Sequence, residues 1–283
     1  MLQAVALTPT KMLHPLRIAV LAVMVLSACA LSPTGRRQLN LFPDDQMAAM
    51  GNQTFQSLKK ERTVSRDPNT QRYVECVTAA LTAELDPRWQ DGWEVVVFED
   101  PTPNAFALPG RKIGVHTGML EVTETQDQLA AVLGHEIGHV MARHGNERLS
   151  QQQLAQIGMM TAAVMTDPET PSGRMTLAAI GLGAEYGVLL PFSRAHESEA
   201  DQIGLVWMAQ AGFDPSESVV LWENMAAQSS GRRPPEWMST HPSTQSRISD
   251  LAASLPEVEP LSRQAVEAGR VPDCRSPHRA AAH

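Results

Sequence analysis

The most constraining feature of the sequence is the run His135-Glu136-Ile137-Gly138-His139, which lies inside an apolar stretch. In a helix, two residues four positions apart lie about 40° apart around the axis, so both imidazoles face the same way. Glu136 lies about 100° round from His135, close enough to meet a water held near the histidines. Two histidines and a glutamate are costly in a buried helix unless they have partners. The run therefore predicts a metal site with a general base.

A third protein ligand is needed to complete such a site. His144 is nine residues after His135, about 180° round the same helix, so we expect it to face away and to be structural. Glu197 and Asp201 are four residues apart on a helix predicted over residues 194–211. One of these carboxylates can bind zinc, while the other accepts a hydrogen bond from a ligand histidine and orients its ring.

Composition excludes several other classes of protein. The chain has 283 residues, a net charge of −8 and a pI of about 5.6, which argues against nucleic-acid binding. Three cysteines are too few for a disulfide-dense scaffold or a cysteine-rich zinc finger.

Residues 1–28 have the pattern of a secretory signal: basic residues, a short apolar run from Ile18 and small residues before a break. A buried helix or a short membrane anchor is the alternative. Leu26-Ser27-Ala28-Cys29 resembles a bacterial lipobox, which implies lipidation of Cys29, and Ala30 after it resembles the outer-membrane sorting pattern. The start codon is Met1 or Met12, and we expect the mature protein to begin at residue 29.

The two other cysteines, Cys76 and Cys274, are far apart in the sequence. In an oxidising compartment such a pair forms a disulfide. The alternative is two unrelated thiols, one in a helix and one in a loose tail.

The periodicity predicts an α+β protein that is mainly helical, with a small β-sheet or hairpin beside the active-site helix. We expect a tether over residues 29–43, one domain over residues 44–256 and a tail over residues 257–283. The predicted strands and helices are as follows: strands at 93–98, 104–108 and 112–117; helices from 44, at 67–85, 124–148 (capped by Thr123), 149–165, 175–190, 194–211, 215–228 and 246–255. The apolar segment 177–190 is predicted to be a buried helix rather than an element that dips into a membrane.

The HExxH motif followed by ExxxD, within Ser193-Arg194-Ala195-His196-Glu197-Ser198-Glu199-Ala200-Asp201, resembles the gluzincin peptidases of the HtpX and CAAX prenyl endopeptidase family. The segments 34–40, 104–106 and 240–242 resemble its periplasmic lipoprotein branch, which includes LoiP and BepA, although no tetratricopeptide repeats follow residue 255. The resemblance covers roughly residues 30–255 and implies a minimal zincin-type metallopeptidase domain.

The resemblance implies one Zn²⁺ bound by His135, His139 and Glu197, with Glu136 as the general base and Asp201 orienting a ligand. It implies a zinc endopeptidase of the bacterial envelope, lipid-anchored and facing the periplasm, that hydrolyses unfolded or misassembled envelope proteins. The alternative is an envelope chaperone or assembly factor with a latent metal site. The substrate is expected to add as an extended strand to residues 113–117 or 104–108.

His241 also matches a family position. The resemblance implies that it gates the zinc or stabilises the transition state, and the alternative is a loop histidine held by Pro242. Arg194 and Arg247 match family positions too, where a salt bridge between helices and a catalytic role are both open.

Overall fold

The HExxH motif lies on a helix at the centre of the fold. The computed structural model describes residues 29–165, 170, 175, 192–229, 237, 239, 241 and 245–275. Helix α6, Gln126–Met141, carries the motif, and its residues from Val132 to His139 are buried. The hydroxyl of Thr125 caps the helix by accepting a hydrogen bond from the backbone N–H of Gln128. The cap is therefore Thr125, two residues after the predicted cap at Thr123.

A three-stranded sheet lies beside α6. Its strands are β3 (Glu94–Phe98), β4 (Ala105–Leu108) and β5 (Lys112–His116), in the order β3-β5-β4. The predicted hairpin is confirmed, because β4 pairs antiparallel with β5, while β3 pairs parallel with β5. Strand β5 is therefore central, and β4 is the edge strand that lies against α6.

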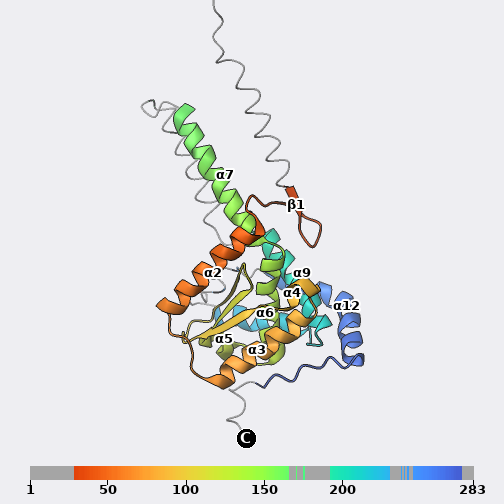
Figure 1. Ribbon diagram of the computed structural model, residues 1–283. Helices are drawn as coiled ribbons and strands as arrows, with labels where there is room; N and C mark the ends of the chain where they lie inside the picture. The colour runs from red at the N-terminus through yellow and green to blue at the C-terminus, as the bar shows by residue number, and fades with distance from the viewer. Residues whose placement is uncertain are drawn as a thin grey trace, which may run out of the picture.

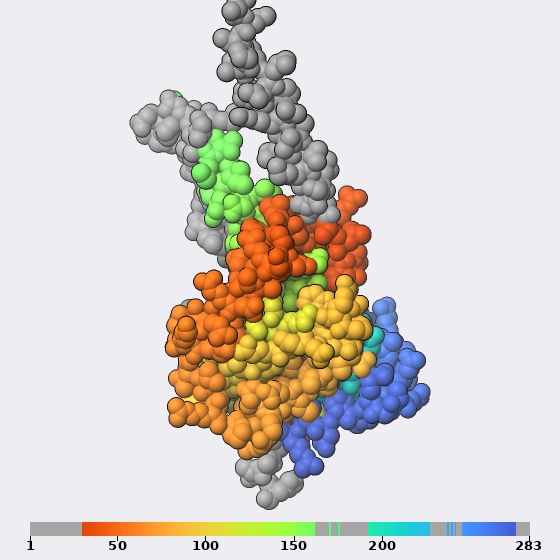
Figure 2. All heavy atoms as spheres, in the orientation of Figure 1, coloured from red at the N-terminus to blue at the C-terminus, as the bar shows by residue number. Residues whose placement is uncertain are grey.

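Helices cover the sheet and α6. In the view of Figure 1 the sheet lies between α2 and α3, and α7 extends away from the body of the molecule. The same view in spheres shows α2 and α3 covering this face, with the yellow atoms of the sheet between them (Figure 2). The helices around α6 are α2 (Asp44–Glu61), α3 (Pro68–Ala83), α4 (Pro87–Gln90), α5 (Thr117–Val122), α7 (His144–Met165), α9 (Arg194–Gln210), α10 (Glu217–Ser229) and α12 (Gln245–Glu267). The prediction of a mainly helical α+β fold is confirmed.

Helices α6 and α9 approach each other closely enough for their backbones to touch. A Cβ atom on Gly138 would lie 2.9 Å from the carbonyl oxygen of Ala200, and one on Gly204 would lie 2.7 Å from the carbonyl carbon of Gly134. Only glycine fits where two backbones are this close. This contact brings Glu197 and Asp201 of α9 to the histidines of α6.

The helix predicted over residues 124–148 is broken into two, so that prediction is wrong. Helix α6 ends at Met141 and α7 begins at His144. Between them Arg143 has a φ of 55°, a left-handed conformation that a helix cannot contain. The side-chain amide of Gln38 donates to the carbonyl oxygen of Ala142 at this break. The break redirects His144, which an unbroken helix would have turned away from the motif.

Residues 29–43 and 257–275 contain regular structure where the sequence predicted a tether and a tail. Residues 29–43 form an antiparallel hairpin of β1 (Cys29–Leu31) and β2 (Arg37–Leu39), whose Gln38 is buried. Helix α12 continues to Glu267, past Pro256 and Pro260, where the sequence predicted its end at residue 255. Beyond it, Cys274 forms a disulfide with Cys76, which ties the C-terminal segment to α3.

Several expectations concern residues outside this description. The predicted signal at residues 1–28 and the predicted helix at 175–190 lie outside the described residues, apart from Met175. Within the described part of the chain, every helix is too short or too polar to cross a membrane.

Candidate metal centre

Four buried side chains converge where α6 meets α9. Each of His135, His139, Glu197 and His241 offers one donor atom, and these four atoms all lie within 4.8 Å of one another. The Nε2 atoms of His135 and His139 are 3.0 Å apart, and Nδ1 of His241 lies 3.1 Å from Oε1 of Glu197. The structure thus brings together the three predicted ligands and places the candidate gate, His241, among them.

The ring of His135 is oriented by Asp201. Nδ1–H of His135 donates to Oδ1 of Asp201 over 2.8 Å, which leaves Nε2 free to face the other donors. Arg247 holds the carboxylate in place through two hydrogen bonds of 2.7 and 2.8 Å. Burial alone would raise the pKa of Asp201, but the bonds from His135 and Arg247 outweigh burial and lower it. Asp201 therefore stays ionised.

Arg247 also reaches the candidate ligand Glu197. Its Nη1 lies 2.7 Å from Oε2 of Glu197, and its guanidinium carbon lies 4.4 Å from the ring centre of Trp222. Of the two open roles for Arg247, the structure shows the salt bridge, which joins α12 to α9. Arg194 is exposed at the start of α9.

The ring of His139 is oriented by His144. Their Nδ1 atoms are 2.9 Å apart, and Nε2 of His144 lies 3.1 Å from Oε2 of Glu199. Burial lowers the pKa of His144 to about 4 and that of His139 well below its usual value, so both rings are neutral near pH 7. If His139 donates from Nδ1 to His144, then His144 donates from Nε2 to Glu199. This assignment leaves Nε2 of His139 with a lone pair aimed at the other donors.

Glu136 lies beside the four donors and takes no part in that group. Its Oε1 accepts a 2.7 Å hydrogen bond from Nε1–H of Trp237 and lies 3.4 Å from Nε2 of His241. Trp237 is buried and stacks on Trp222 with ring centres 4.8 Å apart. The carboxylate of Glu136 is thus held next to the site, as a base requires.

The donor set fits zinc. The Nε2 atoms of His135 and His139 lie 3.0 Å apart and face the same point, while Nδ1 of each ring is turned to Asp201 or His144. Burial alone would lower the pKa of His135, but hydrogen bonds with Asp201 and Glu197 raise it to about 9, so a zinc ion would take the place of a proton on this ring. Burial raises the pKa of Glu197, but hydrogen bonds with His135, His139 and His241 outweigh it and lower the pKa well below the usual range. A buried anionic carboxylate with two imidazoles is a ligand set typical of zinc.

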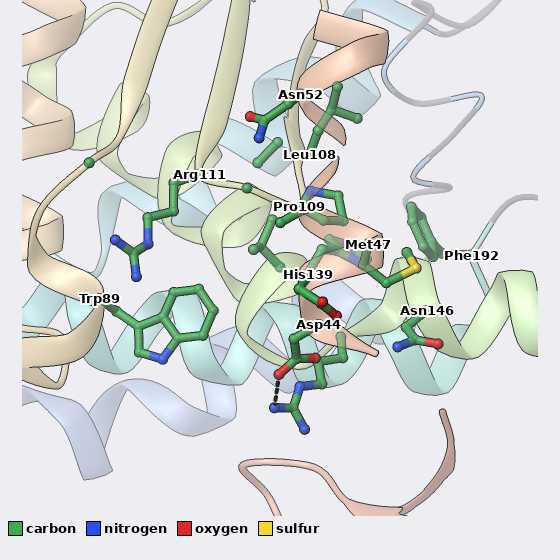
Figure 3. A pocket seen from close by; sticks show the side chains of 18 residues that line it. Asp44, Met47, Asn52, Trp89, Leu108, Pro109, Arg111, His139, Asn146 and Phe192 are labelled. Atoms are coloured by element: carbon green, nitrogen blue, oxygen red, sulfur yellow. Dashed lines mark hydrogen bonds and ion pairs between the residues drawn. The ribbon is translucent and has the colours of Figure 1, made fainter. Parts of the chain in front are cut away.

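A cavity opens beside His139. It has a volume of about 580 Å³ and is bounded by the start of α2, the turn between β4 and β5, the end of α6 and Phe192. Figure 3 shows His139 and Met47 between Trp89 on one side and Phe192 on the other, with Leu108 and Pro109 above. Asp44 lies below His139 in Figure 3 and forms an ion pair with Arg143, which also lines the cavity. The wall is mostly apolar, so the cavity suits an apolar side chain.

Sequence patterns missed four residues of this site. His144 was expected to face away, and the helix break at Arg143 reverses that prediction. Trp237, Phe192 and Trp222 lie outside the motif, and their rings enclose His135, His139 and His241. Trp237 and His241 are four residues apart, a spacing that places two side chains on the same face of a helical turn. In the structure the N–H of His241 donates to the carbonyl oxygen of Trp237, as in such a turn.

Comparison with known proteins gives a consistent result. The sequence matches the model of Peptidase family M48 over residues 68–255, more than half of the chain. It is 42% identical over 168 residues to the mitochondrial metalloendopeptidase OMA1 of Schizosaccharomyces pombe, over 59% of this chain and 48% of the relative. It is 34% identical over 230 residues to the OMA1 of Arabidopsis thaliana, over 80% of this chain and 45% of the relative.

A bacterial relative also matches. The chain is 28% identical over 221 residues to the beta-barrel assembly-enhancing protease of Yersinia pestis, over 76% of this chain and 45% of that protein. The chain thus spans about half the length of the curated relatives it matches.

Proposed function

Because this chain belongs to peptidase family M48, whose members use zinc, we propose that it is a zinc-dependent endopeptidase. The observation that carries the proposal is the convergence of His135, His139 and Glu197 on one point, with Glu136 held beside it. Two imidazoles, a carboxylate and an adjacent base form the arrangement that hydrolytic zinc sites use.

Each residue of the site has its own role in the proposed hydrolysis. Zinc held by His135, His139 and Glu197 would lower the pKa of a bound water and polarise the scissile carbonyl. Glu136 takes the proton of the attacking water and passes it to the leaving amine. Asp201 keeps His135 in the tautomer that a ligand needs.

His241 acts as a gate in this proposal. Its Nδ1 lies 3.2 Å from Nε2 of His135 and 3.1 Å from Oε1 of Glu197, so it occupies the place where a substrate carbonyl or a water would sit. A catalytic zinc site keeps one position open. His241 therefore has to move away before a substrate can bind.

The substrate binds as an extended strand along the free edge of β4, not along the central strand β5. A peptide antiparallel to β4 has its amino-terminal side at Leu108, where the cavity opens, and its carboxyl-terminal side near Pro103. The backbone N–H of Trp237 donates to Pro103 and covers that far end. The cavity then receives a side chain on the amino side of the scissile bond, and its apolar wall favours a large apolar one.

The proposal extends to a cellular role, which residues 26–29 and one group of relatives support. We propose that the protein is anchored in the bacterial envelope through a lipid on Cys29 and cleaves unfolded or misassembled envelope proteins. The lipobox-like residues 26–29 and the likeness to a beta-barrel assembly-enhancing protease support this role. The position of His241 among the ligands favours a second candidate, an envelope assembly factor whose metal site is latent.

The test is cleavage of unfolded casein by the full chain. We expect hydrolysis that a zinc chelator abolishes, and we expect Glu136→Gln to keep zinc and lose at least about 99% of the rate. Glu121→Gln, an exposed glutamate on α5, is the matched control and should keep full activity. Turnover by Glu136→Gln would overturn the mechanism, and a zinc-loaded chain that never cleaves casein would favour the assembly factor.

The cavity is tested by peptides that differ only on the amino side of the scissile bond. Phenylalanine there should be preferred over aspartate, and Ala48→Trp, which narrows the cavity, should remove the preference. Ala49 is the exposed neighbour on α2, so Ala49→Trp should leave the preference unchanged. Equal cleavage of both peptides by the unmodified chain would show that the cavity does not select the substrate.

A further inference from the structure

A second buried cluster of charged groups lies next to the metal centre, beyond His144, and includes none of the four metal donors. Its core is Arg36, in the turn of the N-terminal hairpin, with Glu147 on α7 and Glu199 on α9. Nη1 and Nη2 of Arg36 donate to the two oxygens of Glu147 over 2.9 and 2.6 Å, and Nε donates to Oε2 of Glu199 over 2.8 Å. One guanidinium therefore joins three segments that are distant in the sequence.

Other residues of the hairpin complete the cluster. Oγ1 of Thr34 donates to Oε1 of Glu199 over 2.5 Å, and the amide of Gln38 donates to Oε2 of Glu147 over 3.1 Å. The side chains of Glu147 and Glu199 are only 6% and 3% exposed, so each depends on these bonds to remain buried and ionised.

His144 connects the cluster to the metal centre. Oε2 of Glu199, which accepts from Arg36, also lies 3.1 Å from Nε2 of His144. Nδ1 of His144 lies 2.9 Å from Nδ1 of the ligand His139. Consecutive hydrogen bonds therefore connect Arg36 of the hairpin through Glu199 and His144 to the ligand His139.

We propose that Arg36 is a positioning residue for the metal site: it fixes Glu199, and through Glu199 and His144 it sets the tautomer and orientation of His139. Ligand histidines hold a metal well only when their second nitrogen has a fixed partner. For His135 that partner is the carboxylate of Asp201 on α9, but for His139 it is another histidine, which needs an anchor of its own. The N-terminal hairpin supplies that anchor.

Loss of Arg36 should disturb this line for a simple electrostatic reason. The carboxylates of Glu147 and Glu199 would remain buried without the cation that lies between them. A buried carboxylate that loses its charged partner turns toward other donors or toward water, because its remaining partners, such as Thr34 and Gln38, carry no charge. This movement displaces the acceptor that fixes His144, and His139 then loses its fixed partner.

The test compares two adjacent arginines in the full chain. Arg36 is partly buried in the cluster, whereas Arg37 is exposed on β2. We expect Arg36→Met to raise the dissociation constant for zinc, measured by competition with a chelator, by about 10- to 100-fold. Arg37→Met should stay within about twofold of the unmodified chain. Arg36→Lys should restore part of the affinity, because lysine keeps the charge and lacks the planar set of donors.

The same samples separate positioning from stability. The thermal midpoint of each zinc-free protein shows whether a variant is folded. If Arg36→Met does not fold, Thr34→Val replaces it in the test, because this change deletes one hydrogen bond to Glu199 from an exposed residue. Thr34→Val should also weaken zinc binding. An unchanged zinc affinity in folded Arg36→Met, or in Thr34→Val where that variant substitutes, would overturn the inference.

This inference depends on the proposed metal site and not on peptidase activity. If the unmodified chain fails to bind zinc, the proposed function fails. If the unmodified chain binds zinc and folded Arg36→Met binds it equally well, only the role of Arg36 fails.

Discussion

The indole Nε1–H of Trp237 donates a 2.7 Å hydrogen bond to Oε1 of Glu136, the residue that the HExxH motif assigns as the base. The two residues are 101 positions apart in the sequence, and both are buried. The bond fixes one oxygen of the carboxylate, and in the proposed mechanism the other oxygen accepts the proton of the attacking water. A base held in this way loses little orientational freedom when a substrate binds.

Trp237→Phe removes this bond and keeps an aromatic ring against Trp222. We expect kcat to fall on the order of tenfold, because Glu136 becomes free to turn away from the water. Zinc content, measured by metal analysis, should not change. An unchanged kcat with full zinc content would mean that the bond does not position the base.

His241→Ala opens the position that His241 occupies among the donors. If the competent state makes up about a tenth of the molecules, removing the gate raises kcat/KM about tenfold. Hydrolysis of casein measures the change, and zinc analysis confirms that the three remaining ligands still hold the metal. A fall in kcat/KM at full zinc content would instead assign His241 to transition-state stabilisation.

Gly204→Ala tests the close contact of α6 with α9. The added Cβ would lie within 2.8 Å of backbone atoms of Gly134 and His135, which cannot move independently. We expect the free energy of unfolding to fall by about 1–3 kcal/mol, measured in urea. Zinc affinity should fall as well, because α9 carries Glu197.

Gly158→Ala is the matched control for that substitution. Gly158 lies on α7, and among the described residues no atom outside the nearby backbone of that helix comes within 4 Å of an added Cβ, so the change should raise stability by under about 1 kcal/mol. Equal effects of the two substitutions would show that the contact between α6 and α9 tolerates a side chain.

The stability of the zinc-free protein should fall in acid through the cluster around Arg36. Burial alone would raise the pKa values of Glu147 and Glu199, but hydrogen bonds from Arg36 and its neighbours outweigh burial and lower both to about 2, from 4.5. A carboxyl whose pKa is lower in the folded protein stabilises it fully above pH 4.5, and this stability is lost as the pH falls towards 2.

Urea unfolding at pH 5 and at pH 3 measures this loss. Arg36→Met should reduce the difference in the free energy of unfolding between the two pH values, because both carboxyl pKa values return towards normal. Arg37→Met should keep the difference of the unmodified chain. An equal difference in both variants would mean that other carboxylates cause the acid sensitivity.

The sequence by itself determined the parts of the site that lie within one helical turn or one hairpin. The spacing of four in His135 and His139, and again in Glu197 and Asp201, sets which side chains share a face, because a helix turns by a fixed angle per residue. The strand at 94–98 and the hairpin at 105–116 followed from β-branched residues and a Pro-Gly turn for the same local reason. Residues 68–255 were enough to show the family.

Only the tertiary structure decided which distant groups complete the site. The left-handed residue Arg143 ends α6 early and turns His144 towards His139, an outcome that helical periodicity cannot give. Arg36 and Trp237 reach the site from segments far from α6, and the structure places His241, which the resemblance had singled out, among the donors. Local patterns fix angles within one element, whereas these contacts depend on how elements pack, and the glycine contact between α6 and α9 sets that packing.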